Sequence, residues 1–447
     1  MEHRADRLCL LCIRTFGFSL VGYQRRLGRN GTWALHVCIS DRLFCSLCSP
    51  LSWDGLSGRV RTRWAVTMMP MRCLIIAAIL MLSGQAALTQ SATAQPAGSI
   101  DMGDGRVVPG ATWERTAPEA AGFSTARLDV LRAWLKTHQT TAMMVVYKGK
   151  VVFEYGDIAR ATPVASVRKS VLDMLFAAET KNLGQDLNYK TVVDLGLEDH
   201  VPFVHPEELA NFEQLLASRS GIYIPNGDKD QDQLLPPRGS EYPGSHYFYN
   251  NWDFNALGTA FEKLTHKNIY DALRDDLAIP LGMQDFVRSR QQSEPSPPSI
   301  HKRYPMWLST RDMARLGLLA IYGGKWGGKQ LLDPGFFGWS VSLVTPFADI
   351  NPTGLRNVGL PARWGYGRLW WVWDAPFYPG GTTSGPYQGA FTAMGYGGQF
   401  ITVLPASELV VVHKVDIDRD GNAFITPIAY SSILDMVLDA KCDDSCQ

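Results

Sequence analysis

The sequence lacks the short signatures of four common enzyme classes. It contains no G-x-S-x-G turn, no H-E-x-x-H zinc motif, no Walker A loop and no G-x-G-x-x-G turn. These absences exclude α/β-hydrolases in their usual form, zincin metalloproteases, P-loop enzymes and standard dinucleotide-binding enzymes. If the protein is an enzyme, its chemistry rests on another arrangement of side chains.

Lysine is absent from residues 1–94, where eleven arginines and four acidic side chains give a formal charge of +7. The same segment holds six of the eight cysteines. Residues 95–447 carry 32 basic and 39 acidic side chains, a formal charge of −7. An acidic folded part argues against nucleic acid as the main partner. With 46% apolar and 19% charged residues, the chain can also bury a large core, which excludes a disordered protein.

The apolar run over residues 73–82 is ten residues long, which is too short to cross a bilayer as a helix. It follows Met71 and Arg72 and precedes an A-x-A pattern that ends at Ala94, as in a secretory signal peptide. We predict a signal peptide over residues 68–94 and a periplasmic or secreted product with no stable membrane insertion after cleavage. A retained N-terminal anchor is the alternative.

Residues 1–67 would then precede a signal peptide, a position that export does not favour. They contain Cys9-x-x-Cys12 and Cys45-x-x-Cys48, which resemble the two halves of a zinc site. The gap between the halves is wider than a compact zinc ribbon needs, and the flanks are rich in arginine. We therefore predict no metal here and interpret residues 1–67 as a non-native upstream extension.

The rest of the chain divides into a short lead-in and one larger domain. Residues 95–112 contain Gly, Pro and Ser and are predicted to form an extended lead-in to a domain over residues 113–447. β-Prone runs joined by short turns predict two hairpins, over residues 142–155 and 399–413.

Helices are predicted from capping residues and from the spacing of apolar side chains. The predicted helices begin near Ser124, Ser166 and Ser309 or cover residues 207–217 and 252–264. The region from about 190 to 300 is therefore mostly helical and lies between strand-rich ends. This order favours an α+β fold over repeated βαβ units.

Ser166 and Lys169 form the first candidate catalytic pair. On a helix, positions i and i+3 lie on one face within reach of each other. A neutral lysine can take the proton of the serine hydroxyl, and burial and nearby cations favour the neutral form. The first helical turn also offers free N–H groups to a developing oxyanion. S-x-x-K alone is a weak signal, and a solvated Lys169 is the alternative.

Tyr249 and Asn251 form the second candidate element. A tyrosine hydroxyl can relay a proton if a neighbouring ammonium lowers its pKa. An amide two residues later can orient the lysine or the substrate. Taken alone, Tyr249 is more often a core tyrosine.

Residues 395–399, Gly-Tyr-Gly-Gly-Gln, form the third element and lead into an apolar strand. Glycines at a strand start let another backbone or a ligand come close, and a strand N–H there can be a second oxyanion donor. A simple bulge or turn is the alternative.

In this order, the three elements resemble the serine β-lactamase and penicillin-binding-protein family, particularly its class C-like branch with esterases and 6-aminohexanoate-dimer hydrolases. The resemblance covers about residues 115–440 and includes the segments 215–222, 280–283, 308–315 and 323–326. It implies a β-lactamase/transpeptidase-like α+β fold, in which an antiparallel sheet flanked by helices meets a mostly helical second region.

The resemblance also implies a role for each residue. Ser166 is the acylated nucleophile and Lys169 its general base. Tyr249 protonates the leaving group and then activates the deacylating water, while Asn251 aligns Lys169 and the substrate. The substrate is a small amide or ester, and the mechanism needs no metal or organic cofactor.

The third element implies the oxyanion hole and contains one departure from the family. The backbone N–H groups of Ser166 and Gln399 form the hole, and Gly397 and Gly398 give it room. Tyr396 stands where the branches acting on carboxylate-bearing β-lactams and peptides usually carry Lys or His. A cation that would bind a substrate carboxylate is therefore missing, unless Arg363 or Arg368 supplies it.

The predicted function is an exported serine hydrolase of an amide or ester, with its oligomeric state left open. One alternative is a true β-lactamase or a D-Ala-D-Ala carboxypeptidase, which the tyrosine at position 396 disfavours. The second alternative is a catalytically inactive ligand-binding or cell-wall-sensing protein of the same fold. Retention of Ser166, Lys169 and Tyr249 together argues against this second alternative.

Several other features are predicted to be structural. Residues 416–421 and 228–232 copy part of a calcium loop, but the first has Pro427 in place of the final glutamate and the second lacks the glycine. The first is interpreted as a solvated acidic turn, and no calcium site is predicted at the second.

His413 lies in an apolar strand and is predicted to be a core or edge histidine. Cys442 and Cys446 can close a small disulfide in an oxidising compartment. Five tryptophans are predicted to pack in the core, with an apolar cleft wall as the alternative: Trp307, Trp364, Trp370, Trp371 and Trp373.

Overall fold

The computed structural model describes residues 98–184, 186–350, 364–374, 385–419, 421 and 423–442, and the backbone of five strands between residues 11 and 61. The chain forms two compact units, Met1–Thr93 and Ala94–Gln447. The predicted signal peptide over residues 68–94 lies outside the described residues.

The N-terminal unit contains an antiparallel sheet that the sequence did not predict. Its strands follow in chain order: β1 (Leu11–Thr15), β2 (Phe18–Leu27), β3 (Thr32–Ser40), β4 (Ser46–Trp53) and β5 (Val60–Arg61). Cys12 lies in β1 and Cys48 in β4, with β2 and β3 between them. The strand order therefore does not place these two cysteines on neighbouring strands, while Cys9 and Cys45 lie outside the described residues.

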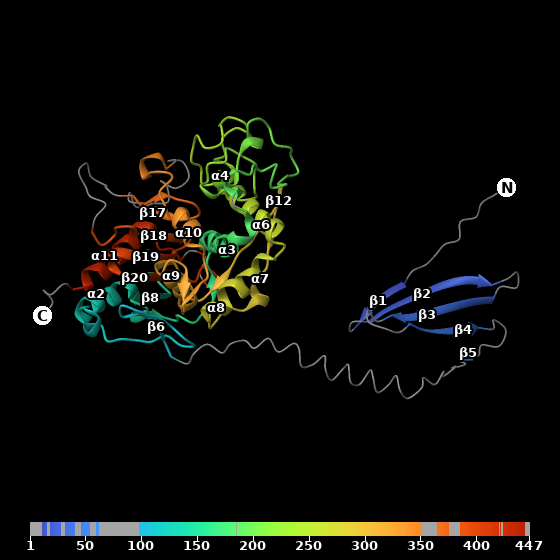
Figure 1. Cartoon of the computed structure of the whole chain (residues 1–447), viewed down its shortest axis with the longest axis horizontal. Coiled ribbons are helices and arrows are strands. Elements are labelled where there is room, and N and C mark those ends of the chain that lie inside the picture. The colour runs from blue at the N-terminus through green and yellow to red at the C-terminus, as the bar shows by residue number, and fades with distance from the viewer. Residues whose placement is uncertain are drawn as a thin grey trace. The chain divides into compact units, whose positions relative to one another are not determined.

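The C-terminal unit is built around a seven-stranded antiparallel sheet (Figure 1). Its strands, in spatial order, are β16 (Trp364–Tyr366), β17 (Trp371–Trp373), β18 (Phe391–Gly395), β19 (Gln399–Leu404), β20 (Leu409–Lys414), β8 (Ala142–Tyr147) and β9 (Lys150–Gly156). Both predicted hairpins are confirmed as β8–β9 and β19–β20. Strand β8 pairs with β20, which joins the two hairpins into one sheet.

Helices cover both faces of this sheet. α2 (Thr125–Lys136) and α11 (Pro427–Ala440) lie on one face, and α3 (Val167–Leu183) and α9 (Thr310–Ile321) lie on the other (Figure 1). Alternate side chains of each strand serve the two cores, so Met143 and Val145 pack toward α2 and α11. Met144 and Val146 pack toward α3 and α9. The α+β prediction is therefore confirmed.

The predicted helix starts are confirmed at two caps. Ser124 Oγ accepts from Arg127 N at 3.4 Å, and Ser309 Oγ accepts from Asp312 N at 3.1 Å. The single helix predicted over residues 207–217 is wrong. Asn211 interrupts it, because its side chain accepts from the Gln214 backbone and the Gln214 side chain accepts from the Asn211 backbone.

Helices are the main regular structure of the second region, as predicted, but more than half of residues 190–300 lie in turns and loops. The region reaches the sheet through α3, which packs against α6. Its elements are η2 (Leu187–Tyr189), η3 (Glu207–Leu209), α4 (Phe212–Leu216), α5 (Lys229–Asp232), α6 (Asn251–Thr265), α7 (Ile269–Ala272), η4 (Leu273–Ala278), α8 (Ile279–Leu281), η5 (Arg288–Arg290) and the hairpin β11 (Glu294–Ser296)–β12 (Ser299–Arg303). Apolar side chains of α3, α4 and α6 share one core.

The predicted extended lead-in forms a hairpin of β6 (Ile100–Gly103) and β7 (Arg106–Val108). It belongs to the domain, because Val108 is fully buried and the Arg315 guanidinium donates to the carbonyl oxygens of Pro109 and Gly110. The remaining short elements are η1 (Glu119–Ala121), β10 (Thr162–Pro163), β13 (Trp307–Leu308), β14 (Lys325–Trp326), β15 (Lys329–Gln330), α10 (Pro334–Ser340), η6 (Phe347–Asp349) and η8 (Pro405–Ser407).

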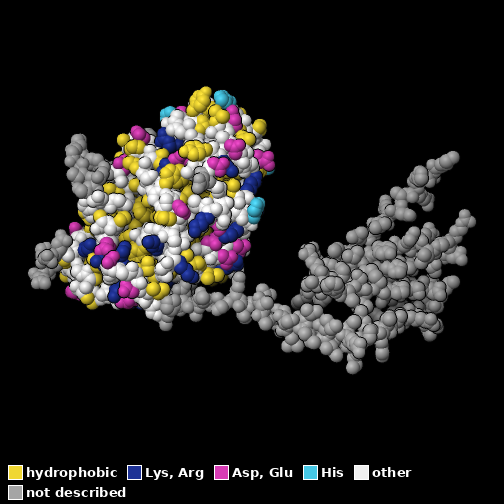
Figure 2. Space-filling view, in the orientation of Figure 1, with side chains coloured by type: hydrophobic (Ala, Val, Ile, Leu, Met, Phe, Trp, Pro, Cys, Tyr) yellow, Lys and Arg dark blue, Asp and Glu magenta, His cyan; other side chains and the backbone are white. Residues whose placement is uncertain are grey.

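Side chains of both charge signs are interspersed over the visible face of the C-terminal unit (Figure 2). Within the described part of the chain, no helix has the length and apolar character needed to cross a membrane. Cys442 is disulfide-bonded, and its expected partner Cys446 lies outside the described residues.

Candidate active site

Ser166 lies at the N-terminal end of α3, where it is half-buried. The preceding residue, Ala165, has a φ of 47°, in the left-handed region that a residue with a side chain rarely adopts. Such strain persists only where the surrounding structure enforces it, and it turns the chain sharply into the helix. The Ser166 side chain consequently faces a cavity at the edge of the sheet.

The structure brings Lys169, Tyr249 and Asn251 together beside Ser166. Lys169 Nζ lies 3.0 Å from Ser166 Oγ, 2.6 Å from the Tyr249 hydroxyl and 2.8 Å from Asn251 Oδ1. Lys169 is only 2% exposed, so the alternative of a solvated lysine is wrong. Two residues at the start of α3 and two at or just before the start of α6, some 80 positions apart, thus share one hydrogen-bonded cluster.

Burial dominates the electrostatics of this cluster. It lowers the pKa of Lys169 well below the ordinary value; the neighbouring Arg168 acts in the same direction and Asp228 opposes it. Burial also raises the pKa of Tyr249 to about 12, against the opposing effects of the Ser166 hydroxyl and Arg168. The prediction of a lowered Tyr249 pKa is therefore wrong. Loss of solvent raises the pKa by more than the nearby positive charge lowers it. Tyr249 is a protonated phenol at neutral pH.

Asn251 is held in one orientation by its neighbours. Its amide nitrogen donates to Asp228 Oδ2 at 3.0 Å, which leaves its Oδ1 to accept from Lys169. Gln231 holds the same segment, since its side chain donates to the Tyr249 carbonyl at 2.6 Å and accepts from the Asn251 backbone at 2.8 Å. The acidic segment 228–232 therefore supports Tyr249 and Asn251.

The third sequence element, residues 395–399, packs against the start of α3. A side chain at Gly395 would place its Cβ 2.4 Å from the Val164 carbonyl and 3.2 Å from Ser166 N, so only glycine fits there. Gly397 and Gly398 have φ values of 83° and 112°. A Cβ on either would collide with the 415–425 segment, so these two glycines permit the turn and its packing.

The buried side chains of Gln399 and His413 hold this turn in place by hydrogen bonds. The Gln399 side chain is fully buried and donates to the Val415 carbonyl at 2.7 Å, so only the Gln399 backbone is available to the site. His413 Nδ1 donates to the Gly398 carbonyl at 2.7 Å, and burial lowers the His413 pKa to about 4. The prediction of a buried core histidine is confirmed.

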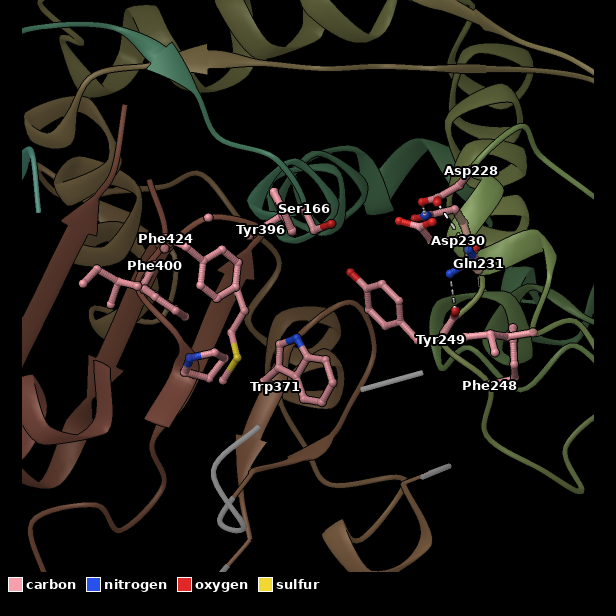
Figure 3. A pocket seen from close by; sticks show the side chains of 18 of the residues that line it. Ser166, Asp228, Asp230, Gln231, Phe248, Tyr249, Trp371, Tyr396, Phe400 and Phe424 are labelled. Carbon is pink, nitrogen blue, oxygen red and sulfur yellow. Dashed lines mark hydrogen bonds between the residues drawn. The ribbon is translucent and has the colours of Figure 1, made fainter. Parts of the chain in front are cut away.

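The cavity in front of Ser166 has a volume of about 420 Å³. Figure 3 shows the Tyr249 hydroxyl directed toward Ser166, with Asp228, Asp230 and Gln231 on one side and Tyr396, Phe400 and Phe424 on the other. Trp371 forms part of the wall, whereas Trp364 and Trp370 are buried in the core. None of the described residues that line the cavity is Lys, Arg or His.

A cation for a substrate carboxylate is therefore missing from the described lining. Tyr396 is 64% exposed at the mouth and meets the Phe424 ring edge-on. Arg368 is buried, forms an ion pair with Glu213 and lies over the Trp339 ring, so it does not supply the charge. Arg363 lies outside the described residues.

No group of acidic, histidine or cysteine side chains in the described part of the chain is arranged to hold a metal ion. Asp416 forms an ion pair with Arg160 at 3.0 Å, and Asp232 binds the backbone N–H groups of residues 226 and 227. Asp420 lies outside the described residues.

Sequence reasoning missed the parts that Asp228 and Arg168 play in this cluster. Asp228 was visible only as part of an acidic run, and its distance of 23 positions from Asn251 carries no local signal. Arg168 lies inside the S-x-x-K motif, but its burial depends on α6 and on the segment around Tyr304.

The comparisons with known proteins agree with this geometry at the level of family and fold. The model of the Beta-lactamase family matches residues 131–413. A search of curated proteins gives no match. Among solved structures, a candidate 6-aminohexanoate-dimer hydrolase from Bacillus anthracis is 20% identical, with a TM-score of 0.52 over 73% of this chain and 86% of that chain.

Two further solved structures are similar. A candidate beta-lactamase from Bacteroides dorei is 17% identical, with a TM-score of 0.52 over 71% of this chain and 99% of its own. A family VIII carboxylesterase is 13% identical, with a TM-score of 0.51 over 74% of this chain and 99% of its own. At such low identities the likeness concerns the fold.

Proposed function

The chain belongs to the Beta-lactamase family of serine hydrolases, and we propose that it hydrolyses a small amide or ester through an acyl-Ser166 intermediate. One observation carries the proposal. Buried Lys169 Nζ lies 3.0 Å from Ser166 Oγ and 2.6 Å from the Tyr249 hydroxyl, within proton-transfer distance of both.

In the proposed acylation step, the Ser166 proton passes to the neutral Lys169 amine as Oγ bonds to the substrate carbonyl carbon. The tetrahedral oxyanion then collapses and the bond to the leaving amine or alcohol breaks. The leaving group receives the Tyr249 phenol proton, and Tyr249 regains a proton from the Lys169 ammonium. Backbone N–H groups of Ser166 and Gln399 are the proposed oxyanion donors.

Deacylation reverses the proton path. A water attacks the acyl carbon as the Tyr249–Lys169 pair takes one of its protons, and Ser166 Oγ leaves and recovers a proton. The raised pKa of Tyr249, about 12, supports its role as an acid first, because the phenol holds its proton at neutral pH. Asn251 keeps the Lys169 amine aligned throughout, since its own amide is fixed by Asp228.

The lining of the cavity favours neutral or positively charged substrates with an apolar part. Asp228 and Asp230 lie on one side and aromatic rings on the other, and the described lining offers no cation for a carboxylate. A β-lactam or a D-Ala-D-Ala peptide carries a carboxylate that Asp228 and Asp230 would repel. This supports amidase or esterase activity over β-lactamase activity. It favours the carboxylesterase kind over the 6-aminohexanoate-dimer-hydrolase kind, because a 6-aminohexanoate dimer also ends in a carboxylate.

We also propose that the enzyme acts in the periplasm or outside the cell. The boundary between the two compact units lies between Thr93 and Ala94, one residue before the predicted cleavage point, and Cys442 is disulfide-bonded. N-terminal sequencing of the protein recovered from the periplasm or medium tests this, with Gln95 expected as the first residue. A cytoplasmic protein that retains residues 68–94 would contradict it.

A substrate panel tests the proposed activity. The full chain should hydrolyse p-nitrophenyl butyrate and a 6-aminohexanoyl anilide faster than nitrocefin, and the Ser166→Ala variant should hydrolyse none of them. A Tyr396→Lys variant should raise kcat/KM for a carboxylate-bearing ester about tenfold relative to its methyl ester. Nitrocefin turnover above that of the esters, or unchanged turnover in Ser166→Ala, would contradict the proposal.

A further inference from the structure

Arg168 is a buried cation that forms no ion pair with any residue the structure describes. Its side chain is 7% exposed, and its guanidinium lies over the Tyr304 ring, 4.2 Å from the ring centre. Its Nη2 donates to Asn255 Oδ1 at 3.3 Å. In the described part of the chain, its buried Nη1 has no hydrogen-bond acceptor and no carboxylate forms an ion pair with it.

An arrangement of this kind lowers the stability of a fold. Burying a guanidinium removes its hydration, and a neutral amide and an aromatic face replace that hydration only in part. A methionine or glutamine at position 168 would avoid the penalty. The position of Arg168, directly before Lys169 in α3, suggests what the charge does.

The direct contacts of Lys169 do not by themselves select the neutral amine. Three oxygens and the ring faces of Tyr249 and Phe254, 4.1 and 4.2 Å from Nζ, would hold an ammonium equally well. Burial and the adjacent positive charge act against the ammonium, in that order of importance.

The other charged groups around α3 do not replace Arg168. Asp228 faces the cluster and favours the ammonium, and the Asp253 carboxyl of α6 has a raised pKa and is bound by Ser220 and Asn250. Strands β18 and β19 contribute no charged side chain. Other titratable or charged groups near α3 are Asp230 in the cavity, Tyr270 and Tyr304 beside Arg168, and the cluster of Glu179, Lys267 and Asp276 toward the C-terminal end of α3. Asp173 of α3 is buried and bound by Ser340 and Trp370, and Tyr247 and Tyr366 are uncharged phenols near Tyr249.

We propose that Arg168 is a positioning residue whose fixed positive charge keeps Lys169 deprotonated and ready to accept the Ser166 proton. The inference rests on the proposed acyl-serine mechanism. The burial of Arg168 costs stability, and on this proposal the charge is retained because it serves catalysis. An adjacent cation is an established way to generate a neutral, reactive lysine.

The test is the pH dependence of Ser166 labelling by a fluorophosphonate, measured on the full chain by intact mass. Arg168→Gln keeps a hydrogen-bonding amide near Asn255 but removes the charge, and Arg168→Met removes both. Both variants should move the acid limb of the labelling rate up by about one pH unit, about a tenfold slower reaction below the midpoint, and should reach the wild-type rate well above it. Arg168→Lys should keep the midpoint close to that of the wild type.

The outcomes separate this inference from the proposed function. Wild-type protein that is folded but not labelled at Ser166 would overturn the function itself. Labelled wild type together with a folded Arg168→Gln or Arg168→Met of unchanged midpoint would overturn only the role of Arg168. A rate that falls by the same factor at every pH would indicate a structural role and would also contradict the proposal.

Discussion

Two lysines of the C-terminal unit are almost completely buried but have different surroundings. Lys169 is 2% exposed and Lys414 is 1% exposed. Lys414 Nζ donates to the backbone carbonyls of Thr162, at 3.0 Å, and Leu308. The hydrogen-bond partners of Lys169 are instead side-chain oxygens, one of which belongs to the Ser166 hydroxyl.

The two lysines show that burial lowers a lysine pKa but does not by itself make the lysine a catalytic base. Burial lowers the pKa of both, to about 7 for Lys414, where Asp416 and two other carboxylates act against burial. For Lys169, Asp228 is the carboxylate that acts against burial, and the neighbouring Arg168 lowers the pKa further. Loss of solvent therefore favours the neutral amine in both places. Among their described hydrogen-bond partners, Lys169 has a serine hydroxyl whose proton it can take, whereas Lys414 has two backbone carbonyls.

Replacing each lysine by glutamine tests this difference most strongly. We expect Lys169→Gln to slow ester hydrolysis by a factor of about 10³ or more, because the general base is lost. Lys414→Gln should stay within about threefold of wild type, since its target carbonyls take no part in the reaction. Kinetics with p-nitrophenyl butyrate, with circular dichroism as the folding control, measure both. Equal losses in two folded variants would contradict the assignment.

Tyr249→Phe removes one oxygen contact of Lys169 and the proposed leaving-group acid. Hydrolysis of an anilide should fall by a factor of about 10² to 10⁴. Acylation by a p-nitrophenyl ester should fall much less, because p-nitrophenolate leaves without a proton. Burst kinetics with the two substrates compare these effects. A uniform loss would show that Tyr249 acts through the structure of the site.

Both buried lysines should make the free energy of unfolding depend on pH in the same direction, because burial lowers the pKa of each. Lys414 has a folded pKa of about 7 and an ordinary value of 10.5, so between these limits the unfolded chain binds more protons. Stability therefore rises with pH in this window, by at most about 1.4 kcal/mol per pH unit for one group. Urea unfolding at pH 7.5 and 9.5 should show a smaller rise for Lys414→Gln and Lys169→Gln than for wild type. An unchanged rise would mean that the replaced lysine is charged in the folded protein.

The smallest effect should come from the carboxylates near each lysine. Asp228 favours the Lys169 ammonium, so Asp228→Asn should move the acid limb of kcat/KM down by a few tenths of a pH unit. Asp416→Asn, the matched change beside Lys414, should leave that limb in place. An upward shift in Asp228→Asn would show that orientation of Asn251 outweighs the charge.

The sequence allowed the local part of the site to be predicted. Ser166 and Lys169 meet because positions i and i+3 share a helix face, and the two hairpins follow from β-prone runs. Tyr249 and Asn251 were placed beside Lys169 only by resemblance to a family, because no local pattern reports a contact across 80 positions.

Other features depended on packing that a local pattern does not report. Strands β16 and β17 have three residues each, which is too short for an alternating pattern to emerge. The break at Asn211 was missed because a reciprocal side-chain cap overrides the apolar spacing of the segment. The direction of the Tyr249 pKa depends on burial, which residue spacing does not reveal.

The central claim is that Ser166 forms a covalent acyl intermediate. Peptide-mapped mass spectrometry of the full chain after treatment with a fluorophosphonate tests it most directly, with Ser166→Ala as the matched control. We expect one adduct, on the peptide that contains Ser166, and none in the Ser166→Ala variant. A folded wild-type protein that takes up no reagent, or takes it up at another residue, would show that Ser166 is not the nucleophile.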